Sequence, residues 1–409
     1  MTGVPLVVAL CLAHVLSLAG FGTFSALLPR FFDEWGLSNT EAGWISGIYF
    51  AGYASAVLVL VSLTDRIDSR LVYLASAALG ALASFGFGWL AHGFWSALGF
   101  RALAGVGLAG TYMPGLKALT DRYGGQRQSR LVAIYTASFG IGVSLSVFAA
   151  GEIAERVHWR WAFALAGLGS LAALAIVAAA VAPLVPARPD GRAPSHLLDL
   201  RPVLKNRAAM AYVLAYGAHC WELLGLRSWI VVFLAFSQSL QPAGAAMWSA
   251  TIIAAIVNLL GVPASIIGNE LAAVLGRRKV AAWIMLASAA LAAVIGYSAS
   301  LPYAVVVLLF LVYGVTVTGD SAAITAGAVE NAVPGQRGAT MAVHSFSGFT
   351  TSFLGPLAFG VVLDLAGGNR SDLAWGLAFL AMGLGCALGP LALAVLGRAA
   401  GAQAREAAP

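Results

Sequence analysis

Residues 71–91 read LVYLASAALGALASFGFGWLA, a run of 21 residues without a charged side chain. An α-helix rises about 1.5 Å per residue, so about 20 apolar residues cross a hydrocarbon layer of about 30 Å. Helices and closed barrels are the folds that pair every backbone amide inside such a layer. The run therefore predicts a membrane-spanning helix.

Similar runs fill the chain from Pro5 to Gly397, separated by short charged connectors. Sixty per cent of the 409 residues are hydrophobic and 10% are charged, with a mean hydropathy of +0.87. Soluble domains carry about 25% charged residues, so a soluble fold is close to excluded. The sequence predicts an all-α polytopic membrane protein with twelve transmembrane helices, at residues 5–29, 42–64, 71–91, 95–118, 131–151, 161–185, 209–236, 243–268, 280–298, 303–327, 339–363 and 373–397.

The basic residues predict the orientation of the chain. With the N-terminus in the cytoplasm, the inner span ends, connectors and tail hold 17 of the 23 Lys and Arg residues. Positive charge collects on the cytoplasmic side of membrane proteins, so we expect both termini there and the protein in the inner (cytoplasmic) membrane. The first run lacks a basic leader and is interpreted as a retained helix. The basic residues form no stripe with interleaved aromatic residues, so no nucleic-acid partner is expected.

The two halves of the chain resemble each other. His14 precedes Gly20 by six positions, and His219 precedes Gly225 by the same distance. The tripeptide GQR recurs at 125–127 and 335–337. Duplicated bundles are common in secondary transporters. We expect two pseudo-symmetric six-helix bundles at 1–185 and 209–398, a cytoplasmic linker at 186–208 and a cytoplasmic tail at 399–409.

Several motifs carry a family resemblance. Residues 64–70 read TDRIDSR and residues 268–279 read GNELAAVLGRRK, and both resemble the GxxxD(R/K)xGRR/K loop of the major facilitator superfamily. Arg101, Gly105 and Gly107 are similar to its RxxxGxG motif, and WRWAF at 159–163 to its WRWxF motif. The resemblance covers nearly the whole chain. It implies two bundles that rock around a midplane site and carry a solute, alone or with an ion.

The resemblance also implies that the two loops gate the transporter, by holding helix ends together on the cytoplasmic side in one conformation. The expected gating residues are Asp65, Arg66, Arg70, Gly276, Arg277 and Arg278. Exposed charge pairs break at a cost of about 0–1 kcal/mol, which suits a gate. The alternative is that the charges of the first loop only set topology. The loops depart from the pattern at Asp68-Ser69, where Gly-Arg is usual, and at Ala272-Ala273, where Asp-Arg is expected.

Seven ionisable residues fall inside the predicted spans. They are His14, Arg101, His219, Glu222, Arg227, Asp320 and His344. A charge at the bilayer centre costs about 3 kcal/mol or more, so such residues usually face a cavity and have a partner. Around a helix, Glu222 lies about 60° from His219, and Arg227 lies about 140° from Glu222. Glu222 and Arg227 are therefore too divergent to pair, and each needs a partner elsewhere.

These residues suggest a substrate and proton pathway. A guanidinium group suits a carboxylate, so Arg227 and Arg101 favour an organic anion as substrate. Buried carboxyl groups take up protons more readily than carboxyl groups in water, so Glu222 with His219, and Asp320, are candidate proton carriers. The alternatives are a structural ion pair for Asp320, Glu222 and Arg227, and a packing role for Arg101. His14 and His344 can simply bond across helix interfaces.

Other patterns exclude further functions. Cys11, Cys220 and Cys386 lie singly in apolar runs, so neither a metal nor a cofactor is expected. No nucleophile with a base is found, so the chain is not expected to be an enzyme. We expect a monomeric secondary transporter in a lipid bilayer that moves a small organic solute, an organic anion coupled to protons. Proton-driven efflux of drugs or metabolites is the alternative, but residues 138–145 lack the Gly-Pro pair of drug antiporters.

Overall fold

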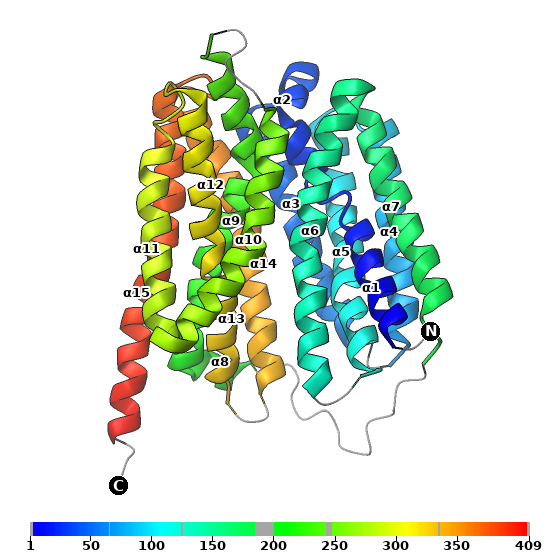
Figure 1. Cartoon of the computed structure of the whole chain (residues 1–409), viewed down its shortest axis with the longest axis vertical. Helices are drawn as coiled ribbons and strands as arrows, with labels where there is room; N and C mark the ends of the chain where they lie inside the picture. The colour runs from blue at the N-terminus through cyan, green and yellow to red at the C-terminus, as the bar shows by residue number, and fades with distance from the viewer. Residues whose placement is uncertain are drawn as a thin grey trace. The chain divides into compact units, whose positions relative to one another are not determined.

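The computed structural model describes residues 3–64, 66–123, 126–184, 200–242, 248–333 and 336–406, with the side chains of 126–130, 133 and 398–406 outside that description. These residues form helices and no strand, which confirms the all-α fold (Figure 1). The helices are α1 (Val4–Ser17), α2 (Thr23–Trp35), α3 (Asn39–Leu63), α4 (Ser69–Leu90), α5 (Phe94–Thr120), α6 (Gln126–Arg156), α7 (Trp159–Ala180), α8 (Arg201–Lys205), α9 (Arg207–Ser239), α10 (Ala250–Leu275), α11 (Arg277–Ile295), α12 (Tyr303–Gly319), α13 (Ser321–Glu330), α14 (Arg337–Leu365) and α15 (Asp372–Glu406).

Ten spans in the described ranges are long and apolar enough to cross a membrane. The predicted span 95–118 falls on α5, which is not among the ten although its 27 residues correspond to about 40 Å of helix. The predicted span 5–29 falls on two shorter helices, α1 and α2. The chain is a multi-pass membrane protein.

The first predicted span is broken between α1 and α2. Ser146 of α6 bridges the break, because its Oγ donates to the carbonyl oxygen of Ala19 at 2.7 Å and accepts from the backbone N–H of Gly22 at 3.0 Å. Polar backbone groups freed by a helix break inside a membrane need such partners. The prediction of one continuous helix over 5–29 is therefore wrong. The segment forms two helices, and a side chain from another helix pairs the backbone groups at the break between them.

The predicted span 303–327 is one membrane-crossing span, Tyr303–Glu330, whose helix is interrupted at a single residue, Asp320, between α12 and α13. The backbone N–H of Ala322 donates to Ser265 Oγ of α10 at 3.3 Å. Gly268 of α10 packs so closely that an added Cβ would lie 1.8 Å from the carbonyl oxygen of Gly319. A side chain of a neighbouring helix therefore stabilises this interruption, as Ser146 of α6 stabilises the break between α1 and α2.

Several helices extend beyond the apolar runs. The predicted span 243–268 corresponds to α10, which begins at Ala250 and continues to Leu275. The predicted linker 186–208 contains α8 and the first two residues of α9. Hydropathy marks the hydrocarbon layer, whereas backbone hydrogen bonding continues into the polar region. These helices therefore extend past the ends of the predicted spans.

The contacts divide the chain into two compact units. Unit 1 comprises Met1–Asp190, Ile230–Val232 and Trp248–Leu259. Unit 2 comprises Gly191–Trp229, Phe233–Met247 and Leu260–Pro409. Each unit therefore has a core of its own.

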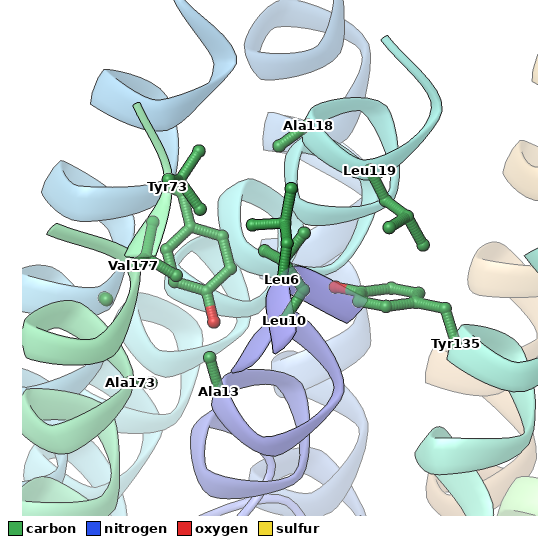
Figure 2. Close-up of a cluster of buried hydrophobic side chains, with 11 residues drawn as sticks. Leu6, Leu10, Ala13, Tyr73, Ala118, Leu119, Tyr135, Ala173 and Val177 are labelled. Atoms are coloured by element: carbon green, nitrogen blue, oxygen red, sulfur yellow. The ribbon is translucent and has the colours of Figure 1, made fainter. Parts of the chain in front are cut away.

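The core of unit 1 is built on α1 and the helices around it. Leu6 and Leu10 of α1 pack with Tyr73 of α4, Leu119 of α5 and Tyr135 of α6, all at most 1% exposed (Figure 2). This apolar cluster fixes α1, which carries His14 one turn beyond Leu10.

Glycine determines how closely α3 and α5 approach each other in unit 1. An added Cβ on Gly105 would lie 1.9 Å from the carbonyl oxygen of Tyr49, and one on Gly52 would lie 2.3 Å from that of Ala102. Small residues allow such backbone contact between membrane helices. The glycine at position 105 of the RxxxGxG motif is therefore a packing requirement.

The core of unit 2 is aromatic. Trp229 of α9 stacks on Phe359 of α14 and meets Trp375 of α15 edge to face. Phe233 of α9 meets Trp375 and Phe379 of α15 edge to face. Trp229 also donates its indole N–H to the carbonyl oxygen of Pro356 at 3.0 Å. These contacts hold α9, the helix that carries His219, Glu222 and Arg227.

Candidate functional site

Four of the predicted site residues come together in unit 2. His219 and Glu222 lie on α9, Asp320 lies at the break between α12 and α13, and His344 lies on α14. Each is at most 2% exposed. Burial of two carboxyl groups and two imidazoles in one helical bundle is costly without mutual contacts, so their partners define what the cluster can do.

Asp320 pairs with His219. The Oδ1 atom of Asp320 lies 2.8 Å from Nδ1 of His219. The two atoms are not aligned as a hydrogen bond, so the contact is an electrostatic one that strengthens when the imidazole carries a second proton. The helix break positions Asp320 as the last residue before α13. A proton gained or lost by either group changes the charge of the pair.

Glu222 is held by two hydroxyl groups. Tyr313 of α12 donates to Oε1 at 3.0 Å, and Ser288 of α11 donates to Oε2 at 3.0 Å. Both donors are neutral, and neither is a guanidinium or ammonium group. The carboxyl group can therefore change its protonation without breaking an ion pair with either donor.

His344 joins the same cluster through Tyr216 of α9. The ring of Tyr216 stacks on that of His344 at 3.8 Å and on that of His219 at 5.8 Å. Thr325 Oγ1 of α13 lies 3.3 Å from Nε2 of His344. The sequence predicted these histidines as separate candidates, whereas the structure places both against one tyrosine. Tyr216 carries no charge, so no sequence pattern marked it as a site residue.

Arg227 lies on the same helix as His219, half-buried. Tyr216 and Cys220 are its electrostatic neighbours. Cys220 and Arg227 are seven residues apart, so they share one face of α9. Arg227 is therefore near the histidine and tyrosine cluster.

Arg101 lies in unit 1 and is 3% exposed. Its Nη1 donates to the carbonyl oxygen of Gly20 at 3.1 Å, and its guanidinium carbon lies 4.1 Å from the ring centre of Tyr49. Within the described residues no carboxylate pairs with it. Backbone carbonyl and aromatic contacts stabilise this charge only in part.

His14 also lies in unit 1, fully buried. Ser138 Oγ donates to the carbonyl oxygen of Tyr135 at 2.6 Å, so its lone pair receives the Nδ1–H of His14 at 2.8 Å. The imidazole lies nearly parallel to the rings of Tyr135, at 4.4 Å, and Tyr112, at 5.1 Å. His14 and Arg101 thus belong to unit 1, and the other five intramembrane candidates belong to unit 2.

The first predicted gating loop is organised by a residue that sequence reasoning did not select. Asp65 lies outside the described residues, and Arg66 is exposed. Asp68 accepts from the backbone N–H of Arg70 through Oδ1 and from that of Leu184 through Oδ2, both at 2.9 Å. Arg70 donates from Nη2 to the carbonyl oxygen of Ala178 at 2.8 Å. An aspartate directly before a helix is a frequent N-cap, and this was the available signal.

The second predicted gating loop contains a forked ion pair. Arg277 contacts Glu330 through Nε and Nη2, both at 2.8 Å, and its Nη1 donates to Asn269 Oδ1 at 2.8 Å. Gly276 precedes α11 with a φ of 95°, which favours glycine. Arg278 packs where a Cβ on Gly397 would stand, 2.3 Å from its guanidinium carbon. Glu330 and Asn269 are thus the polar partners of Arg277. The alanines at 272 and 273, where the family pattern has Asp-Arg, cannot take that role.

A family profile matches most of this sequence, and known proteins match parts of it. The sequence profile described as Major Facilitator Superfamily matches residues 10–356. The niacin transporter NiaP of Acinetobacter baylyi is 22% identical over 156 residues, which are 38% of this chain and 35% of that protein. The uncharacterized MFS-type transporter YcaD of Salmonella dublin is 27% identical over 168 residues, 40% of this chain and 44% of that protein. The matched regions therefore span less than half of these relatives.

Solved structures share the fold. A mutant of the nucleoside transporter NupG superposes with a TM-score of 0.81 and 14% identity, over 96% of this chain and 99% of that one. A bacterial homolog of the human lysosomal transporter Spinster, inward-facing and occupied, gives a TM-score of 0.77 and 16% identity, over 96% of both chains. At these identities the likeness establishes the fold alone.

Proposed function

Because this chain belongs to the major facilitator superfamily of transporters, we propose that it moves a small organic anion across the membrane by alternating access, coupled to protons. The two bundles, 1–185 and 209–398, would rock around the transport site. The linker 186–208 would join them, and the tail 399–409 would follow on the cytoplasmic side.

The observation that carries proton coupling is the buried cluster of Asp320, His219, His344 and Glu222 in unit 2. Asp320 and His219 lie 2.8 Å apart, and the hydrogen-bond donors of Glu222 are neutral hydroxyl groups. A transporter couples to protons when a group binds a proton in one conformation and releases it in another. The break at Asp320 supports this role, because discontinuous helices often carry ion sites in transporters.

The anionic substrate rests on the two arginines inside spans. Arg227 has Cys220 and Tyr216 as electrostatic neighbours, and Arg101 has no acidic partner in the part of the chain that the structure describes. A guanidinium group binds a carboxylate through two parallel hydrogen bonds. Niacin, the substrate named for one relative, is a small organic carboxylate, which supports an organic anion as the substrate.

The proposal also covers the oligomeric state, the membrane and the topology of the protein. We place it in the inner membrane as a monomer, without nucleic-acid partners or catalytic activity, and with both termini in the cytoplasm. The 17 basic residues of the predicted inner segments support this orientation.

Uptake into proteoliposomes tests the substrate class. Labelled nicotinate, benzoate and lactate and a cationic dye would be tested with and without an imposed pH gradient. We expect one or more acids to accumulate only with the gradient, and Arg227→Ala to abolish that uptake at normal protein level. Arg207→Ala is the matched control, because Arg207 is an exposed arginine on the same helix. Transport of the dye alone, dependent on Glu222 or Asp320, would favour the efflux alternative. Full uptake by Arg227→Ala would remove Arg227 from the site.

A further inference from the structure

One side of α11 is exposed along almost the whole helix. Lys279, Trp283, Leu286, Ala290 and Val294 are all exposed, and the exposed fractions of Trp283, Leu286 and Val294 are 53%, 50% and 60%. Steps of three or four residues keep these five side chains on one side of the helix. We call this set the α11 stripe. It begins with a positive charge and continues as an apolar surface.

The other sides of α11 are covered by protein. The helix packs against α12, α13 and α15, and it runs beside α15 in Figure 1. Ala281 and Met285 lie in the core of unit 2, and an added Cβ on Gly383 of α15 would lie 2.7 Å from the carbonyl oxygen of Ala289. Because α11 is long and apolar enough to cross a membrane, the α11 stripe is its lipid-facing side.

Lys279 and Trp283 form a cation–π pair at the start of the α11 stripe. The Nζ atom of Lys279 lies 4.5 Å from the ring centre of Trp283. Arg278, the preceding residue, is also exposed. Neither Lys279 nor Arg278 makes an ion pair with a carboxylate of the described residues. This end of the α11 stripe therefore offers an anion two positive charges, beside an indole ring of the kind that favours the membrane interface.

The start of α11 lies at the basic end of unit 2. Arg277 pairs with Glu330 of α13, and Asn206 Nδ2 donates to the carbonyl oxygen of Asn331 at 2.7 Å, so α9 and α11 begin at the same end. The basic residues that α8, α9, α11 and α14 contribute to this end are Arg201, Lys205, Arg207, Arg277, Arg278, Lys279 and Arg337. Such a gathering is typical of the cytoplasmic side of a membrane, whose leaflet carries anionic lipids.

The dimensions of the α11 stripe suit a lipid better than a free anion. Trp283 and Val294 lie about 16 Å apart along the helix axis. One leaflet of a hydrocarbon core of about 30 Å is about 15 Å deep. A free phosphate ion would contact only the charged end, whereas a phospholipid also covers the apolar remainder. A choline headgroup is disfavoured, because aromatic rings bind quaternary ammonium groups and Lys279 already lies over the ring of Trp283.

We propose that the α11 stripe binds one anionic phospholipid of the cytoplasmic leaflet. The phosphate group of the lipid pairs with Lys279 and Arg278. One of its acyl chains runs along Trp283, Leu286 and Val294. The lipid is a partner of the protein and not the transported solute, so this site stands independently of the proposed substrate and of proton coupling.

Native mass spectrometry of the purified full-length protein in detergent tests the proposal. The protein would be titrated with dioleoylphosphatidylglycerol, which is anionic, or with dioleoylphosphatidylcholine, which has the same acyl chains. We expect one phosphatidylglycerol molecule to bind more tightly than phosphatidylcholine. Lys279→Gln should raise the Kd for phosphatidylglycerol about fivefold and leave the Kd for phosphatidylcholine unchanged, because one basic residue contributes about that factor at an anionic lipid surface.

Two further variants show whether position and charge both matter. Lys279→Arg should keep the affinity for phosphatidylglycerol, because a guanidinium group also stacks on an indole ring. Lys205→Gln is the matched control and should keep it too. Lys205 is an exposed lysine at the same end of unit 2, and no aromatic ring of the described residues lies under its ammonium group.

Three results would overturn the proposal. The first is a wild-type protein with equal Kd values for the two lipids. The second is a Kd for phosphatidylglycerol that Lys279→Gln leaves unchanged or that Lys205→Gln raises equally, since either would indicate a diffuse field without a site. The third is displacement of the lipid by soluble glycerol phosphate at the lipid's own concentration, which would show that the site recognises a free phosphate group.

Discussion

A double-mutant cycle on His219 and Asp320 tests the pairing at the centre of the proposed proton site. The single variants are His219→Gln and Asp320→Asn, and the third variant carries both changes. The pair lies at 2.8 Å with side chains 2% and 4% exposed, so water screens it little. Both substitutions preserve the size of the side chains, so the cycle reports the interaction and not a cavity.

The size of the coupling follows from this burial. Removing one member of a buried pair costs about 3–5 kcal/mol, because it leaves the other member unpaired. When His219 is neutral, the coupling is smaller than for two full charges, because Nδ1 and Oδ1 are not aligned as a hydrogen bond. We therefore expect each single variant to lose about 3 kcal/mol and the double variant to lose clearly less than the sum. The expected coupling is about 2 kcal/mol.

Unfolding in mixed detergent micelles measures the cycle, with the pair Glu152 and Arg156 as a control. That pair also lies within contact distance, but the side chain of Arg156 is 77% exposed, so its coupling should be about 0.2–1 kcal/mol. Losses at His219 and Asp320 that add within about 0.5 kcal/mol would refute the pairing, because independent sites behave in that way.

Three further outcomes follow from the packing, the loops and the proton site. Gly105→Ala should strongly lower the Tm and the yield, because its Cβ would lie 1.9 Å from a carbonyl oxygen of α3. Gly99→Ala is the control and should change neither, because no atom lies within 4 Å of an added Cβ there. Equal thermal unfolding curves for the two variants would contradict this reasoning. Arg277→Gln should reduce uptake several-fold at normal protein level, because the fork to Glu330 is lost, and unchanged uptake would show that the loop does not gate. Asp320→Asn should keep exchange of labelled acid across vesicles but lose accumulation driven by a pH gradient, and normal accumulation would exclude Asp320 as a proton carrier.

The sequence predicted the helical membrane fold and most span positions, because hydrophobic length is a local property that needs no partner. The helix breaks were not predictable. The break before α2 depends on Ser146 and the break at Asp320 depends on Ser265, both from other helices. A sequence read along one helix contains no signal for a hydroxyl group that a neighbouring helix supplies.

The candidate site was predicted in its charged members and missed in its neutral ones. His219 and Asp320 were selected because ionisable residues in spans are costly. Their mutual contact joins α9 to the end of α12, and sequence spacing does not encode such a distance. Tyr216, Tyr313 and Ser288 complete the cluster with uncharged groups, which are common in membrane helices and so carry no signal of their own.

Simultaneous recording of solute and proton flux in the same vesicles tests the central claim most directly. A labelled acid that the protein transports would be followed together with the internal pH. The proposed mechanism predicts that each rise in internal acid is accompanied by a proportional pH change, and that Asp320→Asn removes the pH change while exchange of the acid continues. Wild-type transport of the acid without any pH change, or transport by Asp320→Asn with the full pH change, would contradict proton coupling through this cluster.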